Sequence, residues 1–427
     1  MTLKAHAFCD CIAGRVPALP SSQHSSTAIM LSSLTGESSR VRRPSLDDDV
    51  IILLRALRTM GLEAELVQGD LRIDAQDMGM TAERMEVESS ELAFCMVCSL
   101  ASNIPRRTII DGSLPQNFPI HPFVNALLNL GVNCDFPRRD WRLPMNVRGP
   151  HRSHMTYMPW DSPPMAFLSL ALGSLYGVRP TRIEATGRGC RPLLHPKDLD
   201  LMRRFGVSME ASRNWIHNPG GQRCHPAEVL VPSDGLLEDF FLCLGIMHGQ
   251  VDISGIGRPS PAFSCLRQAG LDVHLEDGVL RSRKLETTDA HLDAKDCPAS
   301  APFLLVAASS WTGLSRIDVR QDAMTLQEKV ALRYSISLLR KMGCDVMENG
   351  DSLFVPGSEL GVAQLRPSSV ESGLTAVLAA SRNASAEVLG VEMVTNRYPG
   401  ITSELKSIGL DLCLNEDDEQ VFLLRVD

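Results

Sequence analysis

The chain has 427 residues, of which 44% are hydrophobic and 22% charged, and its 51 acidic residues outnumber its 42 basic ones to give a net charge of −9. This composition is typical of a soluble globular protein of two or three domains. The Lys and Arg residues are scattered and the net charge is negative, so no nucleic-acid partner is expected. No apolar run reaches the roughly 18 residues of a membrane span, and the first twenty residues lack the apolar stretch of a secretory signal. We therefore expect a cytoplasmic protein with no membrane association.

One pattern recurs along the chain: an amphipathic helical stretch ends at a glycine, and a short alternating segment follows. The first copy is LRALRTMGLEAEL, and the junction glycines are separated by 64 to 75 residues. In chain order these glycines are Gly61, Gly131, Gly206, Gly270, Gly343 and Gly409. Six units of similar length therefore fill the protein.

Each copy of the pattern has a direct physical interpretation. Apolar residues at i, i+3, i+4 and i+7 form one buried face of a helix, and glycine supplies the left-handed residue that ends it. The alternation after the glycine, as in L-E-A-E-L or L-D-V-H-L, predicts a strand with one buried face. Further β-rich segments, such as RRTIIDGSL and QVDISGIG, precede the helices. We expect two lobes of three units, with helices inside, sheets outside and a ligand-binding cleft between the lobes, in preference to a continuous solenoid.

Twelve cysteines in a chain of this length do not indicate a disulfide framework. Cys95 and Cys98 form a Cys-x-x-Cys pair, but they lie in the apolar helical run ELAFCMVCSLA. A zinc site would need a second pair or histidines at matching spacing, and neither is present. His151 and His154 lie in a proline-rich segment with no carboxylate partner placed by spacing. We expect buried core thiols, no metal and no cofactor.

The segment LPSSQHSSTAIMLSSLTGESSRVRRPSLDDDVIILLRALRTMGLEAEL, residues 19–66, resembles the opening of the enolpyruvyl transferases, especially the 5-enolpyruvylshikimate-3-phosphate (EPSP) synthases. It is similar to the family's Pro-Gly-Ser-Lys start, its Ser-Asp-Asp turn and its Ala-Leu-x-x-Leu-Gly helix, and the six-unit organisation is also the family's. The resemblance implies an α/β fold of two inside-out α/β barrel domains built from six βαβ-type units. It implies a discontinuous first domain, residues 1–19 plus 234–427, and a second domain, residues 20–233.

The resemblance also implies a reaction. Members of the family bind phosphoenolpyruvate (PEP) and a phosphorylated or nucleotide-linked acceptor in the cleft between the domains. A proton is added to the PEP methylene, the acceptor hydroxyl attacks, and phosphate leaves. Several anionic groups meet in one site, so the chemistry needs cations, each contributing roughly 1.5 to 3 kcal/mol through a charge-assisted hydrogen bond.

This chain departs from the family at motif positions that the resemblance assigns to substrate binding or catalysis. The residues at those positions are Gln23, Ala28, Glu88, Ser90, Phe94, Phe118, Ala299, Gln327, Ala331, Glu371 and Asn396. Most of these stand where the family has Lys, Arg or Asp. Losing three such contacts would weaken binding by roughly 4 to 9 kcal/mol, a thousandfold or more. The substitutions therefore predict that ordinary EPSP synthesis has been lost.

Two residues are the candidate catalytic groups. Glu328 aligns with the family's catalytic Glu, and a cleft lined by Phe94, Phe118 and Ala331 would raise the pKa of that carboxyl into an acid/base range. The alternative is that Glu328 caps the helix that follows it. His24 stands where the family has a small hydroxyl residue, and it would shuttle protons near neutral pH. The alternative for His24 is an ordinary surface or hydrogen-bonded imidazole.

A further set of residues is expected to bind substrate. These are Ser22, Gln23, Ser26, Asp49, Glu88, Ser90, Phe94, Phe118, Asp161, Asp296, Lys329, Glu371 and Arg397. For Ser22 and Ser26 the alternative is satisfaction of a helix N-terminus; Asp161 and Asp296 have the alternative roles of turn residue and helix cap.

Three functional hypotheses follow. The first is a diverged enzyme of specialised metabolism that acts on a small molecule by proton transfer, through cyclisation, elimination or isomerisation, without PEP. The second keeps carboxyvinyl transfer with a pocket rebuilt from Arg397, Lys329 and Arg191. The third is a non-catalytic relative that binds a ligand or a partner. The internal duplication makes a monomer plausible.

Overall fold

The computed structural model describes residues 4–8, 11–79, 82–115, 118–138, 140–151, 153–177, 179–187, 192–383 and 385–415. The chain divides into two compact units. The first unit comprises Met1–Leu19 and Ser233–Asp427, and the second unit is Pro20–Pro232.

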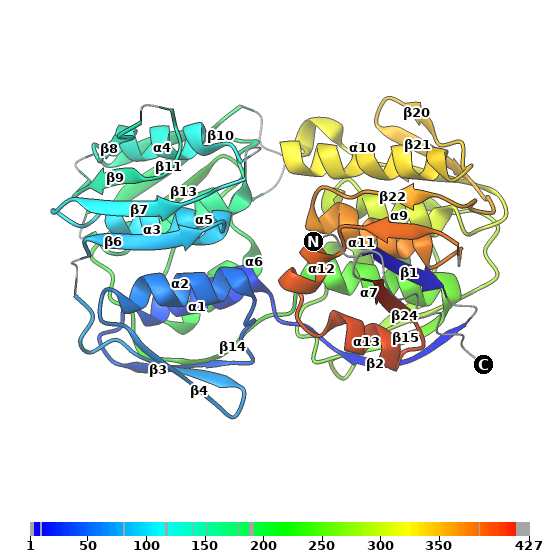
Figure 1. Cartoon of the computed structure of the whole chain (residues 1–427), viewed down its shortest axis with the longest axis horizontal. Helices are drawn as coiled ribbons and strands as arrows, with labels where there is room; N and C mark the ends of the chain where they lie inside the picture. Colours follow the sequence, from blue (N-terminus) through cyan, green and yellow to red (C-terminus); the bar gives the residue numbers. More distant parts are fainter. Residues whose placement is uncertain are drawn as a thin grey trace. The chain divides into compact units, whose positions relative to one another are not determined.

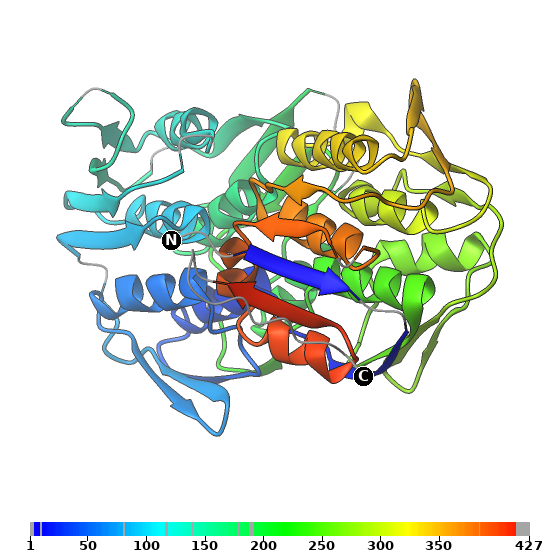
Figure 2. The ribbon, with the colours of Figure 1, turned by 45° about the vertical axis from the view of Figure 1, so that its right-hand side comes forward.

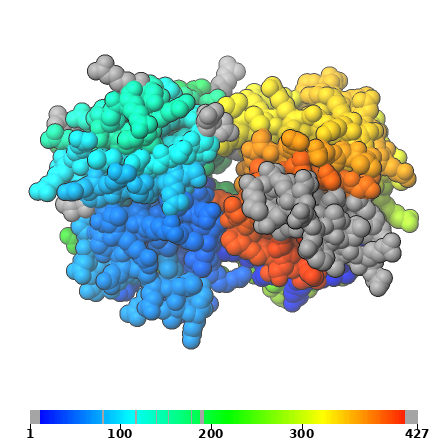
Figure 3. All heavy atoms as spheres, viewed as in Figure 1, coloured from blue at the N-terminus to red at the C-terminus, as the bar shows by residue number. Residues whose placement is uncertain are grey.

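Each unit contains three four-stranded sheets with one repeated strand order. The first two strands of a sheet run parallel, and the third and fourth add antiparallel. In the second unit the sheets are β14 (Glu228–Leu230), β3 (Ser38–Arg42), β5 (Asp70–Asp74), β4 (Glu63–Val67); β6 (Arg84–Glu88), β7 (Thr108–Gly112), β9 (Met145–Arg148), β8 (Asn133–Asp135); and β10 (Met155–Pro159), β11 (Thr181–Thr186), β13 (Trp215–Asn218), β12 (Glu210–Ala211). In Figure 3 the first repeat of this unit (blue) and the second (cyan to green) form adjacent bands on the visible face.

The first unit repeats the same plan with strands from both ends of the chain. Its sheets are β2 (Ile12–Pro17), β15 (Gly249–Ser254), β17 (Val279–Arg283), β16 (Val273–Glu276); β18 (His291–Asp293), β19 (Leu314–Asp318), β21 (Ser352–Pro356), β20 (Met347–Asn349); and β22 (Gln364–Leu365), β23 (Glu387–Leu389), β1 (Lys4–Phe8), β24 (Asp411–Asn415). β2 pairs parallel with β15, and β1 pairs antiparallel with β24. Figures 1 and 2 both draw β1 in dark blue beside the red β24. The start of the chain therefore completes two sheets of this unit, which is why the unit is discontinuous.

Two kinds of helix accompany the sheets. The inner helices are buried nearly all round and pack on one another within their unit: α1 (Ser22–Ser32), α3 (Glu91–Ala101) and α5 (Pro164–Ser174), and in the first unit α7 (Gly235–His248), α9 (Ala301–Ala308) and α11 (Val370–Ala380). The outer helices keep an exposed face: α2 (Asp48–Arg58), α4 (Ile120–Asn129), α6 (Pro196–Arg204), α8 (Pro261–Gln268), α10 (Leu326–Lys341) and α13 (Ile401–Ser407). The short helices η1 (Pro298–Ser300), η2 (Gln321–Ala323) and α12 (Glu392–Arg397) lie in the first unit. An all-round apolar helix belongs in a core and an amphipathic one at its edge, so composition separates the two kinds.

The predicted junction glycines end the six outer helices. All six have left-handed backbones, with φ between 77° and 93°. Each is followed by the fourth strand of its sheet, as the alternating segments predict. The prediction of six repeated strand and helix units is confirmed, but the helices that end at the junction glycines keep an exposed face, and a second set of helices forms the interior.

Candidate active site

The first two turns of α1 are polar although they are buried. Ser22, His24, Ser25, Ser26 and Thr27 are each at most 7% exposed, whereas the buried residues of the inner helix α3 are nearly all apolar. Ser21 caps the helix, its side chain accepting from the backbone N–H of His24. We call Ser21–Thr27 the α1 head. Burying polar groups is costly unless they are hydrogen-bonded, so such a helix start indicates a partner or a site.

The partner of the α1 head is the first turn of α6. Asp198 is 1% exposed there, and its carboxylate accepts from Gln23 Nε2 at 3.0 Å and from Thr27 Oγ1 at 3.3 Å. His24 Nε2 lies 3.6 Å from Asp198 Oδ1. The imidazole of His195, which caps α6 by accepting from the Lys197 N–H at 3.1 Å, stands edge-on to that of His24 with ring centroids 5.6 Å apart. The N-termini of α1 and α6 and the buried carboxylate of Asp198 therefore lie next to one another.

Burial sets the electrostatics of this cluster. Desolvation raises the pKa of Asp198 to about 7, although the bonds from Gln23 and Thr27 and the charge of Lys197 favour the carboxylate. Desolvation also lowers the pKa of His24 well below its usual value, and the charges of His195 and Lys197 lower it further. At neutral pH the imidazole is therefore uncharged and the carboxyl lies near its midpoint.

Lys197 supplies a cation at this place. It is the only lysine in residues 20–232, and it is 7% exposed. Lysine is rarely buried to that degree, because its charge is strongly hydrated. The charge of Lys197 acts on both His24 and Asp198.

Three side chains of the α1 head lack partners. Among the described residues, no hydrogen bond reaches Ser22 Oγ, Ser26 Oγ or either ring nitrogen of His24, though all are buried. Gln23 is held by Asp198, and Ser25 bonds Ser21 O at 2.8 Å. Unsatisfied buried polar atoms are uncommon in native proteins and are candidates for contact with a ligand.

The other predicted residues of the second unit form separate local contacts. Ser90 caps α3 and donates to Asp49 Oδ1 at 2.6 Å, and Glu88 pairs with Arg55 at 2.8 Å. Phe94 is fully buried, its ring packed edge-on against Phe118 at a centroid distance of 6.0 Å. Those two rings are therefore core residues of this unit.

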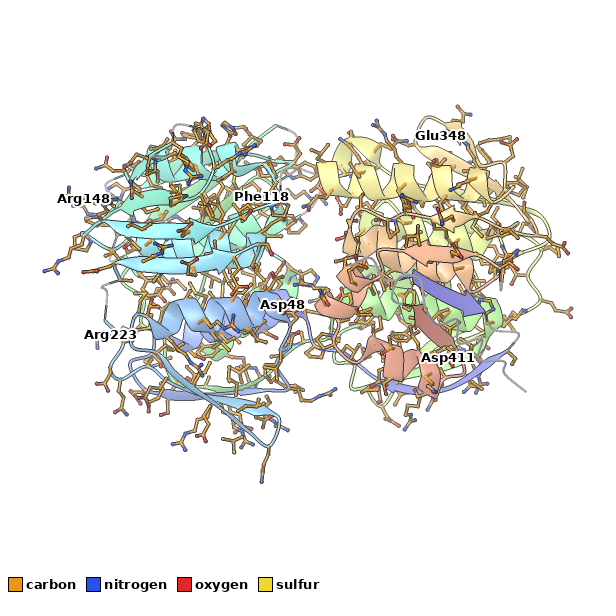
Figure 4. The ribbon with its side chains drawn as sticks, viewed as in Figure 1. Asp48, Phe118, Arg148, Arg223, Glu348 and Asp411 are labelled. Atoms are coloured by element: carbon orange, nitrogen blue, oxygen red, sulfur yellow. The ribbon has the colours of Figure 1, made fainter. Side chains whose placement is uncertain are left out.

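Asp161 is the remaining predicted site residue of the second unit, and the starts of α2 and α4 also bear on where an anion could bind. Asp161 is exposed. Figure 4 labels Asp48 at the start of α2 and Phe118 just before α4, and both lie on the same side of this unit in that view. Positive helix ends gathered on one side favour anions there.

In the first unit, Glu328 caps α10. Its Oε2 accepts from the Thr325 backbone N–H at 2.7 Å and from Thr325 Oγ1 at 2.9 Å, which with the reciprocal Thr325 cap completes a capping box. The half-buried Lys329 follows it, and its ammonium makes no hydrogen bond or ion pair with any described residue. The alternative interpretation of Glu328 as a helix cap thus holds in this structure.

Glu371 and Arg397 come together around a tyrosine. Tyr398 is 5% exposed, receives a hydrogen bond from Arg397, and experiences the charges of Asp234 and Glu371; burial raises its pKa well above the usual value. Asp296 is exposed. Arg191 lies outside the described residues.

Sequence reasoning missed the acidic and basic residues that enter the buried regions from distant segments. Asp198 and Lys197 are one case. Asp239 is another: it is 4% exposed in α7, and Ser300, beside Ala299, donates to its Oδ2 at 2.5 Å. The available signal was a pair of charged residues in an otherwise apolar inner helix, Glu238-Asp239 of GLLEDFFLCLG.

None of the helices in the described part of the chain combines the length and hydropathy of a membrane span. No group of three or more His, Cys, Asp or Glu side chains among the described residues is arranged to hold a metal ion.

Comparison with known proteins identifies relatives over most of the chain. The family model for EPSP synthase (3-phosphoshikimate 1-carboxyvinyltransferase) matches residues 9–405. A 3-phosphoshikimate 1-carboxyvinyltransferase of Methanocorpusculum labreanum is 24% identical, covering 94% of this chain and 97% of that protein. Another, from Clostridium acetobutylicum, is 24% identical over 94% of this chain and 96% of that protein.

Solved structures show the same fold. An EPSP synthase from Acinetobacter baumannii has a TM-score of 0.80 at 16% identity, covering 97% of this chain and 100% of that one. An enolpyruvyl transferase from Streptomyces tendae has a TM-score of 0.72 at 14% identity, covering 97% and 99%. The predicted fold class is confirmed.

These relatives contradict the hypothesis of a PEP-free proton-transfer enzyme of specialised metabolism, because carboxyvinyltransferases match nearly the whole chain. The error has a physical cause. A motif-by-motif comparison records a cation as lost at Gln23, but it does not detect Lys197, which reaches the same helix start from α6. The chain has the fold of an enolpyruvyl transferase enzyme, and it belongs to the EPSP synthase (3-phosphoshikimate 1-carboxyvinyltransferase) family.

Proposed function

We propose that this protein transfers the carboxyvinyl group of PEP to a hydroxyl of 3-phosphoshikimate, the reaction for which its curated relatives are named. Family membership over residues 9–405 is the observation that carries the proposal. The products would be the enolpyruvyl ether and inorganic phosphate.

The α1 head supports binding of an anionic substrate. PEP and a phosphorylated acceptor both present oxygen anions, which need donors and positive charge. The α1 head offers the hydroxyls of Ser22 and Ser26, the N-terminal end of a helix, and the neighbouring Lys197 ammonium. Lys197 would take over the role of the Lys that the family carries where this chain has Gln23.

The first unit offers a second cation and a carboxylate. Lys329 is half-buried and makes no hydrogen bond or ion pair with another described residue, so its ammonium is available to an anion. Glu328 precedes it at the start of α10 and is the residue that the resemblance assigns to proton handling. Arg397, held at Tyr398, is a further donor.

The direct experiment is to incubate the purified chain with PEP and shikimate 3-phosphate, measuring phosphate release and the enolpyruvyl ether by mass spectrometry. Equal amounts of both products are expected. In Lys197→Met and Lys329→Met we expect the KM for PEP or the acceptor to rise about 10- to 100-fold, the value of one charge-assisted hydrogen bond. Lys406→Met, at an exposed lysine of α13, is the matched control and should leave KM unchanged.

Calorimetry separates the outcomes of that experiment. If PEP binds but no ether forms with shikimate 3-phosphate, the acceptor assignment is wrong. If neither PEP nor the acceptor binds, carboxyvinyl transfer is wrong and the chain is a binding protein of the same fold.

A further inference from the structure

The His24 imidazole has an unused nitrogen in a buried place. The side chain is 9% exposed and neither ring nitrogen makes a hydrogen bond with a described residue, but Nε2 lies 3.6 Å from Asp198 Oδ1, within ion-pair distance. A neutral imidazole carries one N–H and one lone pair, so the position of the proton decides which nitrogen can act as a base.

Asp198 is positioned to decide where that proton sits. Gln23 Nε2 and Thr27 Oγ1 both donate to its carboxylate, which fixes its orientation toward α1. The ionised carboxylate accepts hydrogen bonds and cannot donate them. It would therefore hold the proton of His24 on Nε2 and leave a lone pair on Nδ1.

We propose that His24 is the base that takes the proton of the acceptor hydroxyl, and that Asp198 is the positioning residue that keeps His24 in the Nε2–H tautomer. The proposal rests on the proposed carboxyvinyl transfer. As the hydroxyl oxygen forms its bond to C2 of PEP, its proton moves to Nδ1. When the C–O bond to phosphate breaks, His24 gives that proton to the departing phosphate and returns to its neutral form. The proton added to the methylene comes from a separate acid and is lost again on elimination.

The surroundings of His24 suit this role. The titratable groups whose charges reach it are His195 and Lys197, both on α6, together with Asp198 at 3.6 Å. The two basic neighbours and burial keep the imidazole neutral, as a base must be before it accepts a proton. Below pH 7 Asp198 becomes protonated, donates to Nε2 and drives the N–H onto Nδ1, so the base is lost.

The first test uses activity. In the wild type, kcat should rise with pH, with a midpoint near pH 7, as Asp198 ionises. Asp198→Asn and His24→Gln should each lower kcat about 100-fold or more, with KM for both substrates within about threefold, and the step near pH 7 should be absent from Asp198→Asn. Lys406→Met, at an exposed lysine of α13 in the first unit, should retain kcat within about threefold. An unchanged kcat in His24→Gln, or a retained step in Asp198→Asn, overturns the proposal.

The second test does not depend on turnover. In ¹⁵N-histidine-labelled protein, the His24 signals, identified by their loss in His24→Gln, should show the Nε2–H tautomer at pH 8 and the Nδ1–H tautomer below pH 6. An Nδ1–H tautomer at pH 8 contradicts the pairing. If the wild type makes no ether, the proposed function fails while the tautomer still decides whether Asp198 controls His24.

Discussion

Gln23 and Asp198 are joined by a 3.0 Å hydrogen bond that ties the start of α1 to the start of α6. The donor from Gln23 is a neutral amide, so it offsets only part of the cost of burying the carboxylate, and desolvation raises the pKa of Asp198 to about 7. The charge of Lys197, in the same turn of α6, also favours the carboxylate.

The raised pKa of Asp198 predicts that this residue makes the fold less stable as pH rises. Its folded pKa of about 7 exceeds the ordinary value of 3.8, so between these values the folded state holds a proton that the unfolded state has released. The contribution of Asp198 to the free energy of unfolding is therefore largest below pH 3.8. It falls by on the order of 4 kcal/mol as the pH rises to about 7.

Urea unfolding at pH 5 and pH 8 measures this effect. Because the depressed pKa of His24 acts in the opposite direction, the useful quantity is the difference between wild type and Asp198→Asn, which retains His24. The variant should gain stability relative to the wild type on going from pH 5 to pH 8. A difference independent of pH would show that Asp198 is ionised throughout.

The capping box of α10 predicts different effects for its two members. Thr325→Ala should destabilise the first unit by about 1 kcal/mol, because the Glu328 N–H loses its acceptor. Glu328→Gln should change stability little, since glutamine at this position completes the same box. Denaturation curves compare the two variants.

Glu328→Gln also separates capping from chemistry. A fall in kcat with unchanged stability would assign Glu328 to proton handling, and full activity would leave it as a cap alone. Equal destabilisation by Glu328→Gln and Thr325→Ala would contradict the geometry described here.

Two of the junction glycines should respond differently to alanine. Both Gly61 and Gly343 have φ of +93°, which costs an L-residue roughly 1 to 2 kcal/mol. A Cβ on Gly61 would lie 2.5 Å from the backbone oxygen of Asp77, whereas nothing lies within 4 Å of one on Gly343. Thermal unfolding should show a larger loss for Gly61→Ala than for Gly343→Ala, and the reverse order would be inconsistent with the packing at Asp77.

The cysteines should differ in reactivity by position. Cys95 and Cys98 are fully buried, and burial raises the pKa of both thiols, so neither the thiolate nor access is available. Cys11 is exposed. Iodoacetamide treatment of the native protein at pH 8, followed by peptide mapping, should label Cys11 and spare the pair, while labelling of Cys95 before unfolding would refute the burial.

Local patterns gave most of the fold. Each outer helix has an apolar face, ends at a glycine and is followed by an alternating strand, all within about 15 residues. A short stretch of sequence therefore contains what is needed to predict them. Gly61 and Gly409 have the predicted left-handed backbone for this reason. The prediction of buried thiols at Cys95 and Cys98 is confirmed by the same argument, because they lie in a helix that is apolar all round.

The candidate site depends on contacts between residues that are far apart in the sequence. The sequence pointed to His24 through a motif position, but its neighbours Lys197 and Asp198 come from another repeat of the same unit, and nothing near them in the sequence indicates which helix they meet. Likewise the role of Glu328 in the Thr325 cap follows from its local spacing, whereas the approach of Asp234 and Glu371 to Tyr398 is decided only by the folded chain. Backbone conformation and burial periodicity are local properties, so the sequence alone determined the repeated architecture. Charge compensation depends on distance through space, so only the tertiary structure decided which positive groups face the start of α1.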